Sequence, residues 1–129
     1  MTLAPLRSEI RWAIEAAQEK QAVDITVLAL PGAFAEYFLL CSGRSQPQIQ
    51  AIGEAVEERL AQQGVRLAHR EGKYGAEWVL LDYGSFVVHI FSERARQYYD
   101  LERLWRTAGR MDFPAPGPRG KSETGGAEP

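Results

Sequence analysis

The chain has 129 residues, of which 45% are hydrophobic and 25% are charged, and this composition is typical of one globular domain with its own core. Its formal net charge of −2 disfavours a broad nucleic-acid footprint, because such a footprint needs a clustered excess of Lys and Arg. Cys41 is the only cysteine, which excludes an intramolecular disulfide and a cysteine metal cluster. The first residues do not resemble a secretion signal, and the longest apolar run is too short to cross a bilayer. We therefore expect a soluble, cytoplasmic protein without membrane contact.

Two segments have the apolar repeat of amphipathic helices. The first covers about residues 5–20, and Pro5 suits its first turn. The second begins after Ser45, a favourable N-cap, with Gln48 three residues later as its capping-box partner. Gly64 ends this helix. We expect these two helices to form the main helical layer of the fold.

Short β-rich runs bounded by turn residues predict the strands of a sheet. Residues 25–30 and 37–42 are almost entirely apolar, as in strands that are buried on both faces. Residues 65–69 are predicted to form a third, short strand.

Residues 77–91 are predicted to form a β-hairpin, because two apolar arms flank a tight turn. Side chains alternate across a strand, so Val79 and Leu81 share one face while Trp78 and Leu80 share the other. Neither face is polar. The hairpin is therefore either covered twice by its own chain or covered once and offered to a partner.

Residues 92–105 predict a helix in which Asp100 can cap a second turn. We assign residues 1–107 to one domain and expect 108–129 to be a disordered Pro/Gly-rich tail, since that segment has little to bury. The element order predicts an α/β (α+β) fold, a mixed five-stranded sheet with helices mainly on one face. The other face would be partly uncovered.

Several segments together resemble one known family. The most specific are Trp-Val-Leu-Leu-Asp-Tyr-Gly at residues 78–84 and Tyr-Asp-Leu-Glu-Arg-Leu-Trp at residues 99–105. They are supported by residues 35–43, 48–52 and 87–91. In this order the segments resemble the ribosomal silencing factor family, also called RsfS or Iojap-like proteins, over about residues 10–105.

The resemblance implies a fold similar to nucleotidyltransferases without their activity. It also implies a repressor that binds the large ribosomal subunit at its fourteenth protein, with little direct nucleic-acid contact. By occupying the face that meets the small subunit, such a protein blocks subunit joining and lowers translation under nutrient limitation.

The expected docking surface combines the uncovered face of the hairpin with the helix that follows it. An exposed aromatic side chain beside an aliphatic one is typical of an interface anchor, and acidic residues around it would steer a basic ribosomal protein. The predicted partner-binding residues are Trp78, Leu80, Asp82, Tyr83, His89, Tyr98, Tyr99, Asp100, Leu101 and Glu102.

Structural alternatives remain open for three of these residues. Trp78 could belong to the core, His89 could be a half-buried sheet histidine, and Glu102 could form an ion pair on a helix surface. The same apolar face could also support a homodimer.

The alternative function is a nucleotidyltransferase-like enzyme that acts on a nucleotide. The run Ser-Gly-Arg-Ser at residues 42–45 precedes a helix, but the paired carboxylates that would hold Mg²⁺ are missing. Cys41 and His89 could form a nucleophile and base, although a lone Cys in an apolar strand is usually a buried hydrophobe. We therefore expect no enzymatic activity, no cofactor and no metal.

Overall fold

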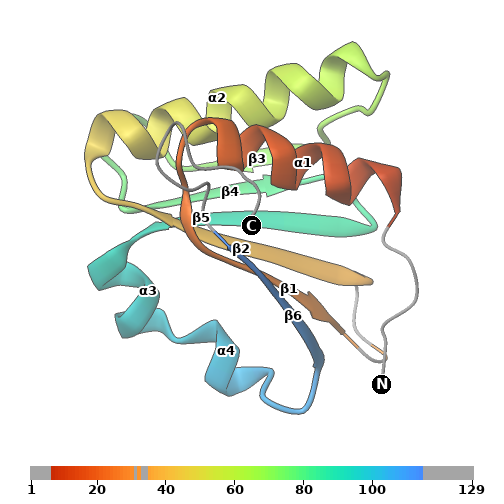
Figure 1. Cartoon of the computed structure of the whole chain (residues 1–129), viewed down its shortest axis with the longest axis vertical. Coiled ribbons are helices and arrows are strands. Elements are labelled where there is room, and N and C mark those ends of the chain that lie inside the picture. The colour runs from red at the N-terminus through yellow and green to blue at the C-terminus, as the bar shows by residue number, and fades with distance from the viewer. Residues whose placement is uncertain (1–6, 31, 33–34, 115–129) are drawn as a thin grey trace, which may run out of the picture.

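The computed structural model describes residues 7–30, 32 and 35–114, whose elements form a central sheet between two helical layers (Figure 1). The helices are α1 (Ser8–Glu19), α2 (Gln46–Gln62), α3 (Glu93–Tyr99) and α4 (Leu101–Leu104). The strands are β1 (Val23–Ala29), β2 (Tyr37–Gly43), β3 (His69–Glu71), β4 (Trp78–Asp82), β5 (Phe86–Ser92) and β6 (Gly109–Phe113).

The sheet is mixed, with the strand order β3-β4-β5-β2-β1-β6. Strands β2 and β5 are parallel, and every other neighbouring pair is antiparallel. The predicted hairpin is confirmed as β4 and β5, in which Leu80 pairs with His89 and Trp78 with Phe91. The mixed α/β class is thus confirmed, with six strands where five were predicted.

The two long helices cover one face of the sheet. Ile10 and Ile14 of α1 and Ile52 and Val56 of α2 pack in the same buried cluster as the strand residues that face them. On the hairpin, the residues of this cluster are Val79, Leu81, Phe86, Val88 and Ile90. Val79 and Leu81, which strand alternation placed together on one face of the hairpin, therefore face the two long helices.

The N-terminus of α2 is capped much as predicted. The Ser45 hydroxyl accepts a hydrogen bond from the Gln48 backbone N–H at 3.2 Å. The Gln48 side-chain oxygen accepts from the backbone N–H of Arg44, at 2.6 Å, instead of from Ser45 as in a standard capping box. The Gln48 amide also donates to the carbonyls of Lys20 and Gln21, which fastens the end of α1 to the start of α2.

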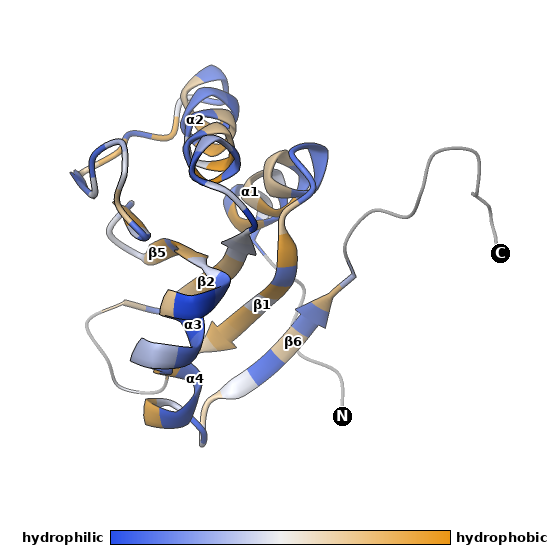
Figure 2. Ribbon diagram, turned by 90° about the vertical axis from the view of Figure 1, so that its left-hand side faces the viewer, coloured by the Kyte–Doolittle hydropathy of each residue, from blue (hydrophilic) through white to orange (hydrophobic). Residues whose placement is uncertain are grey.

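The opposite face carries the two short helices, α3 and α4, so the helices are not confined to one face (Figure 1). Its core is smaller and includes Phe38 and Leu40 of β2 together with Phe91 of β5. Ala95 of α3 packs into this core, whereas α4 contributes no buried residue. In Figure 2, α3 is coloured mostly hydrophilic, whereas the strand β1 is largely hydrophobic.

The predicted disordered tail is wrong for residues 109–113, which form the edge strand β6 and pair with β1 from Ile25↔Phe113 to Ala29↔Gly109. Its alternating hydrophilic and hydrophobic residues are visible in Figure 2. The folded domain therefore extends past residue 107, and the rest of the predicted tail, residues 115–129, lies outside the described residues. The strand predicted at 65–69 is also displaced, because β3 begins only at His69, where pairing with β4 becomes possible.

Candidate functional site

A row of aromatic rings runs across the face of the sheet that carries α3 and α4. The ring centroids of Tyr98 and Tyr99 are 5.0 Å apart, and those of Tyr99 and Trp78 are 4.6 Å apart. The row continues through Trp78–His89 at 5.8 Å, Phe38–His89 at 4.4 Å and Phe38–Trp105 at 6.0 Å. Separations of 4.5–7 Å are typical of favourable aromatic pairs. The row therefore joins β4, α3 and the end of α4 into one surface.

One end of this row, at Tyr98 and Tyr99, is exposed, its middle is buried, and its other end, Trp105, is half-buried. The exposed fraction is 79% for Tyr98 and 50% for Tyr99, against 3% for His89. Leu104, which is 72% exposed, adds an aliphatic group beside Trp105. The half-buried side chains of Trp78, Leu80, Leu101 and Trp105 pack against the core beneath them. We define the aromatic surface as Trp78, Leu80, Tyr98, Tyr99, Leu101, Leu104 and Trp105.

Trp78 is held in place by His89. Its indole N–H donates to Nδ1 of His89 at 3.1 Å, and its ring packs on Phe91 at 5.0 Å. Nδ1 is thus the acceptor, which places the proton of the neutral imidazole on Nε2. Burial lowers the pKa of His89 to about 4, so the ring is neutral at pH 7. Trp78 is consequently half core and half surface, since one side packs inward and the other lies beside Tyr99.

His89 does not reach the surface in this structure, which corrects its prediction as a direct contact residue. Its Nε2 is buried and has no hydrogen-bond partner among the described residues. The sequence placed His89 correctly on the same face as Trp78, but it could not show that the tryptophan would cover it. Its role is therefore to position Trp78.

Two predicted residues at the hairpin turn have structural contacts of their own. Tyr83 packs against the opposite core, below α1 and α2, with its ring stacked on Phe86 at 5.1 Å. Burial raises the pKa of its hydroxyl to about 12. Asp82 accepts a hydrogen bond from the Gly84 N–H at 2.8 Å, which stabilises the turn. The face of Tyr83 was missed because strand alternation cannot be extrapolated through a turn.

Glu102 was predicted to belong to an acidic rim, but the structure assigns it to an internal network. Both carboxylate oxygens accept from Arg96, each at 3.0 Å, and Arg110 lies 3.1 Å away. The hydrogen bonds from Arg96 are the main cause that lowers the pKa of the Glu102 carboxyl. Asp100 adopts the left-handed conformation (φ 50°) between α3 and α4, and its side chain makes no capping bond.

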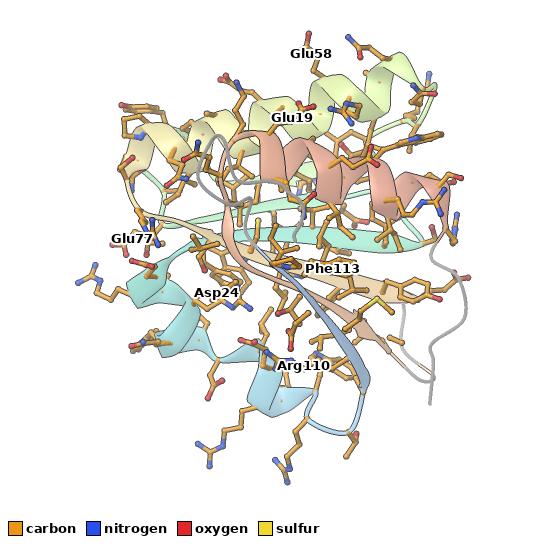
Figure 3. All side chains as sticks on the ribbon, in the orientation of Figure 1. Glu19, Asp24, Glu58, Glu77, Arg110 and Phe113 are labelled. Atoms are coloured by element: carbon orange, nitrogen blue, oxygen red, sulfur yellow. The ribbon has the colours of Figure 1, made fainter. Side chains whose placement is uncertain are left out.

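The role of Arg96 was not predicted from the sequence. This buried guanidinium donates to the Asp24 carbonyl at 2.6 Å, to the Thr26 hydroxyl at 3.2 Å and to the Ser42 hydroxyl at 3.3 Å. It therefore ties α3 to β1 and β2 and, through Glu102, fixes α4 as well. Figure 3 shows Asp24 and Arg110 on the side of the sheet that carries α3 and α4, away from Glu19 and Glu58.

The described residues do not assemble the predicted alternatives for catalysis. Cys41 packs with the core below α1 and α2, whereas His89 lies on the other face of the sheet, so they cannot form a nucleophile–base pair. Burial also raises the pKa of the Cys41 thiol to about 12. Within residues 7–30, 32 and 35–114, no group of three or more His, Cys, Asp or Glu side chains is placed to hold a metal ion. No helix in this part of the chain is long and apolar enough to cross a membrane.

Fold and site together define the class as a mixed α/β domain that presents an aromatic surface on one face of its sheet. Comparison with known proteins identifies the family. The model of the family described as "Ribosomal silencing factor during starvation" matches residues 4–128. The ribosomal silencing factor RsfS of Bacillus subtilis is 39% identical over 109 residues, which cover 83% of this chain and 92% of that protein.

Solved structures show the same similarity. A crystal structure of a Chromobacterium violaceum protein aligns with a TM-score of 0.76 and 30% identity, and the alignment covers 91% of this chain and 98% of that one. A Bacillus halodurans protein aligns with a TM-score of 0.68 and 38% identity over 74% and 91% of the two chains. The chain belongs to the ribosomal silencing factor family, whose names describe a regulator of translation and not an enzyme.

Proposed function

We propose that this protein represses translation by occupying the large ribosomal subunit and sterically blocking its association with the small subunit. The contact on the large subunit is its fourteenth protein, as the family resemblance implies. The observation that carries the proposal is the aromatic surface, in which Tyr98, Tyr99 and Leu104 are exposed and Tyr99 lies beside Trp78. Clustered exposed aromatic residues of this kind are typical of protein-docking sites.

The arrangement of the two sheet faces supports this assignment. The helices α1 and α2 close one face over a buried core, and neither contributes to the exposed large hydrophobic residues in the described part of the chain. On the other face, the short helices α3 and α4 leave Trp78 and Leu80 half exposed. Aromatic anchors with few rotatable bonds lose little conformational entropy when they bind, and a rigid sheet below them keeps that loss small.

The test is co-sedimentation with purified large and small ribosomal subunits, followed by a subunit-joining assay. We expect binding to the large subunit alone and a dose-dependent loss of joined ribosomes. Binding to neither subunit would refute the proposal. Binding to the large subunit with normal joining would refute the occlusion mechanism while leaving the docking site intact.

A second copy of this chain is the competing occupant of the aromatic surface. A homodimer through this surface would hide the residues that we assign to the ribosome. Light scattering over a range of concentrations separates the two cases. A dimer that persists on dilution to concentrations at which subunit binding saturates would contradict the assignment, whereas a monomer at those concentrations supports it.

A further inference from the structure

The segment that follows the aromatic surface is locally basic although the chain as a whole is acidic. Residues 103–111 contain Arg103, Arg106 and Arg110 and no Asp or Glu, in a chain whose net charge is −2. This segment includes the end of α4 and the start of β6. It thus places a cluster of arginines at one border of the surface.

Two of the three arginines are available to a partner. Arg110 is engaged, because Glu102 lies 3.1 Å from it and Asp112 also lies 3.1 Å from it. Arg103 and Arg106 are exposed, and neither has a carboxylate within ion-pair distance in the described part of the chain. Among the described residues, the one hydrogen bond made by either side chain joins the Arg106 guanidinium to the Arg103 carbonyl at 3.5 Å, which is too long to hold the side chain firmly.

The neighbours of these arginines suit a mixed contact. Leu104 stands between them in sequence with 72% of its side chain exposed, and the hydroxyl-bearing Thr107 follows, also exposed. Arginine pairs with phosphate through two parallel hydrogen bonds, and threonine hydroxyls commonly add a further phosphate contact. An exposed leucine between two such arginines suits a position where a ribosomal protein meets ribosomal RNA, because the leucine can contact the protein and the arginines the phosphates.

We infer that Arg103 and Arg106 bind backbone phosphates of ribosomal RNA at the edge of the protein docking site. The inference rests on the proposed function and adds an RNA component to it, where the sequence had led us to expect little nucleic-acid contact. The phosphate backbone is the dominant anionic chemistry on a ribosomal subunit, and guanidinium groups without internal partners are complementary to it. Arg110 belongs to the same cluster, but it is already engaged in ion pairs with Glu102 and Asp112.

The test compares three proteins by their affinity for purified large subunits over a series of salt concentrations. These are the unchanged chain, the double variant Arg103→Ala/Arg106→Ala, and a matched control, Arg11→Ala/Arg66→Ala. The control removes two exposed arginines that also lack a carboxylate partner among the described residues, one on α1 and one after α2. Thermal unfolding of all three confirms that the fold is unchanged, as expected for exposed side chains.

Each phosphate contact contributes about 0.7–0.9 to the slope of log affinity against log salt concentration, so the double variant should lose about 1.5 from that slope. Between 50 and 200 mM salt, the affinity of the unchanged chain should then fall about tenfold more than that of the variant. The control should keep the full slope. Affinity for the isolated, RNA-free fourteenth protein should be the same for all three proteins.

Other outcomes overturn the inference in distinguishable ways. An unchanged slope in the double variant would show that the arginines touch no phosphate. An equal loss of affinity for the RNA-free protein would show that they contact an acidic protein surface instead. If the unchanged chain bound neither ribosomal subunit, the proposed function would fall first and this inference with it.

Discussion

Trp78 and His89 act as one unit in this molecule. The tryptophan covers the histidine, and the histidine accepts the indole N–H at 3.1 Å. Replacing Trp78 by Ala would therefore uncover a buried polar ring as well as remove a contact residue, so loss of binding in that variant would not separate the two roles. A clean test of the aromatic surface must use a side chain that packs on little else.

Tyr98 meets that requirement. We expect Tyr98→Ala to weaken binding to the large subunit by about tenfold or more, because exposed aromatic anchors in a docking site are often worth at least about 1–2 kcal/mol. Its free energy of unfolding should stay within about 0.5 kcal/mol of the unchanged chain, because the side chain is 79% exposed. A filter-binding titration and urea unfolding measure the two effects.

Tyr74→Ala is the matched control for this prediction. Tyr74 is 74% exposed but lies in the segment between β3 and β4, where the neighbouring Lys73 carbonyl accepts a hydrogen bond from Gln50 of α2. It should bind the large subunit as the unchanged chain does. Equal weakening by the two substitutions would show that the effect does not depend on where the exposed tyrosine lies. The aromatic surface would then not be the docking site.

His89 predicts a specific dependence of stability on pH. Its pKa of about 4 in the folded chain is below the ordinary value of 6.5, so the unfolded chain binds the proton more readily. The stability contribution is therefore complete above pH 6.5 and is lost as the pH falls toward 4. Between pH 7 and pH 5 this one group should lower the free energy of unfolding by about 2 kcal/mol.

The variant His89→Gln isolates this contribution from that of the carboxyl groups. It has no titrating ring, and its side-chain oxygen can still accept the Trp78 N–H. Urea unfolding at pH 7 and at pH 5 should therefore show a smaller loss in the variant than in the unchanged chain. Parallel pH profiles would mean that His89 titrates with an ordinary pKa, and the buried, neutral ring described above would be wrong.

At the scale of elements, α4 depends on polar contacts more than on apolar burial. It has no buried residue, yet it presents Leu101 and Leu104 and leads into Trp105. The Arg96–Glu102 pair and the bonds from Arg96 to β1 and β2 hold it against the sheet. Because a buried charge left without its partner is strongly unfavourable, this network supports both the fold and the geometry of the aromatic surface.

We expect Arg96→Gln to lower the free energy of unfolding by about 3 kcal/mol, because it leaves Glu102 partly buried without its main cation. Amide hydrogen exchange should accelerate over α4 more than over α1 and α2. The nearby Arg94→Gln is the control, since Arg94 is highly exposed and its one ion pair among the described residues is with Glu77 at the surface. A similar loss in both variants would contradict the assignment of α4 to the Arg96 network.

The edge strand β6 gives a second prediction at this scale. A chain that ends at Ala108 should be less stable by at least about 2 kcal/mol than one that ends at Pro114, because it loses five paired residues that cover one side of β1. It also loses Asp112, whose carboxylate accepts the Thr26 hydroxyl at 2.8 Å, and Arg110 beside Glu102. Urea unfolding of the two chains measures the difference. Equal stabilities would show that β6 is dispensable.

The elements that the sequence predicted well are those with strong local signals. The apolar repeats and the Ser45 cap located α1 and α2, and the alternation of the hairpin correctly separated Val79 and Leu81 on one face from Trp78 on the other. The features that it missed depend on contacts between distant residues. Strand β6 pairs Phe113 with Ile25, and the Arg96 side chain donates to the Asp24 carbonyl. Both contacts join residues far apart in the sequence, so no local sequence pattern predicts them.

The same distinction applies to the candidate site. Trp78, Leu80, Tyr98, Tyr99 and Leu101 lie together as predicted, because strand alternation and helix position were enough to place them. His89 was predicted as a contact residue because it would lie near Trp78 and Leu80 on one face of the sheet, and Glu102 because it could belong to an acidic rim. Burial beneath Trp78 and pairing with Arg96 are visible only once the chain is folded.

At the scale of the whole molecule, the proposed occlusion makes a prediction about reciprocity. If this protein and the small subunit exclude each other sterically, each must weaken the binding of the other by the same factor, without limit as its concentration rises. A labelled chain bound to large subunits should therefore be released completely by increasing small subunit. The apparent dissociation constant should rise in proportion to one plus the ratio of small-subunit concentration to its own dissociation constant.

An indirect mechanism would behave differently. If the protein altered the large subunit at a distance, its apparent dissociation constant would rise and then reach a plateau, because a ternary complex could form with a finite coupling energy. Fluorescence anisotropy of the labelled chain, titrated with small subunit at several fixed concentrations of large subunit, separates the two forms. The Tyr98→Ala variant should give the same proportional rise from a weaker starting affinity, since it changes the docking contact and not the volume that the bound domain occupies.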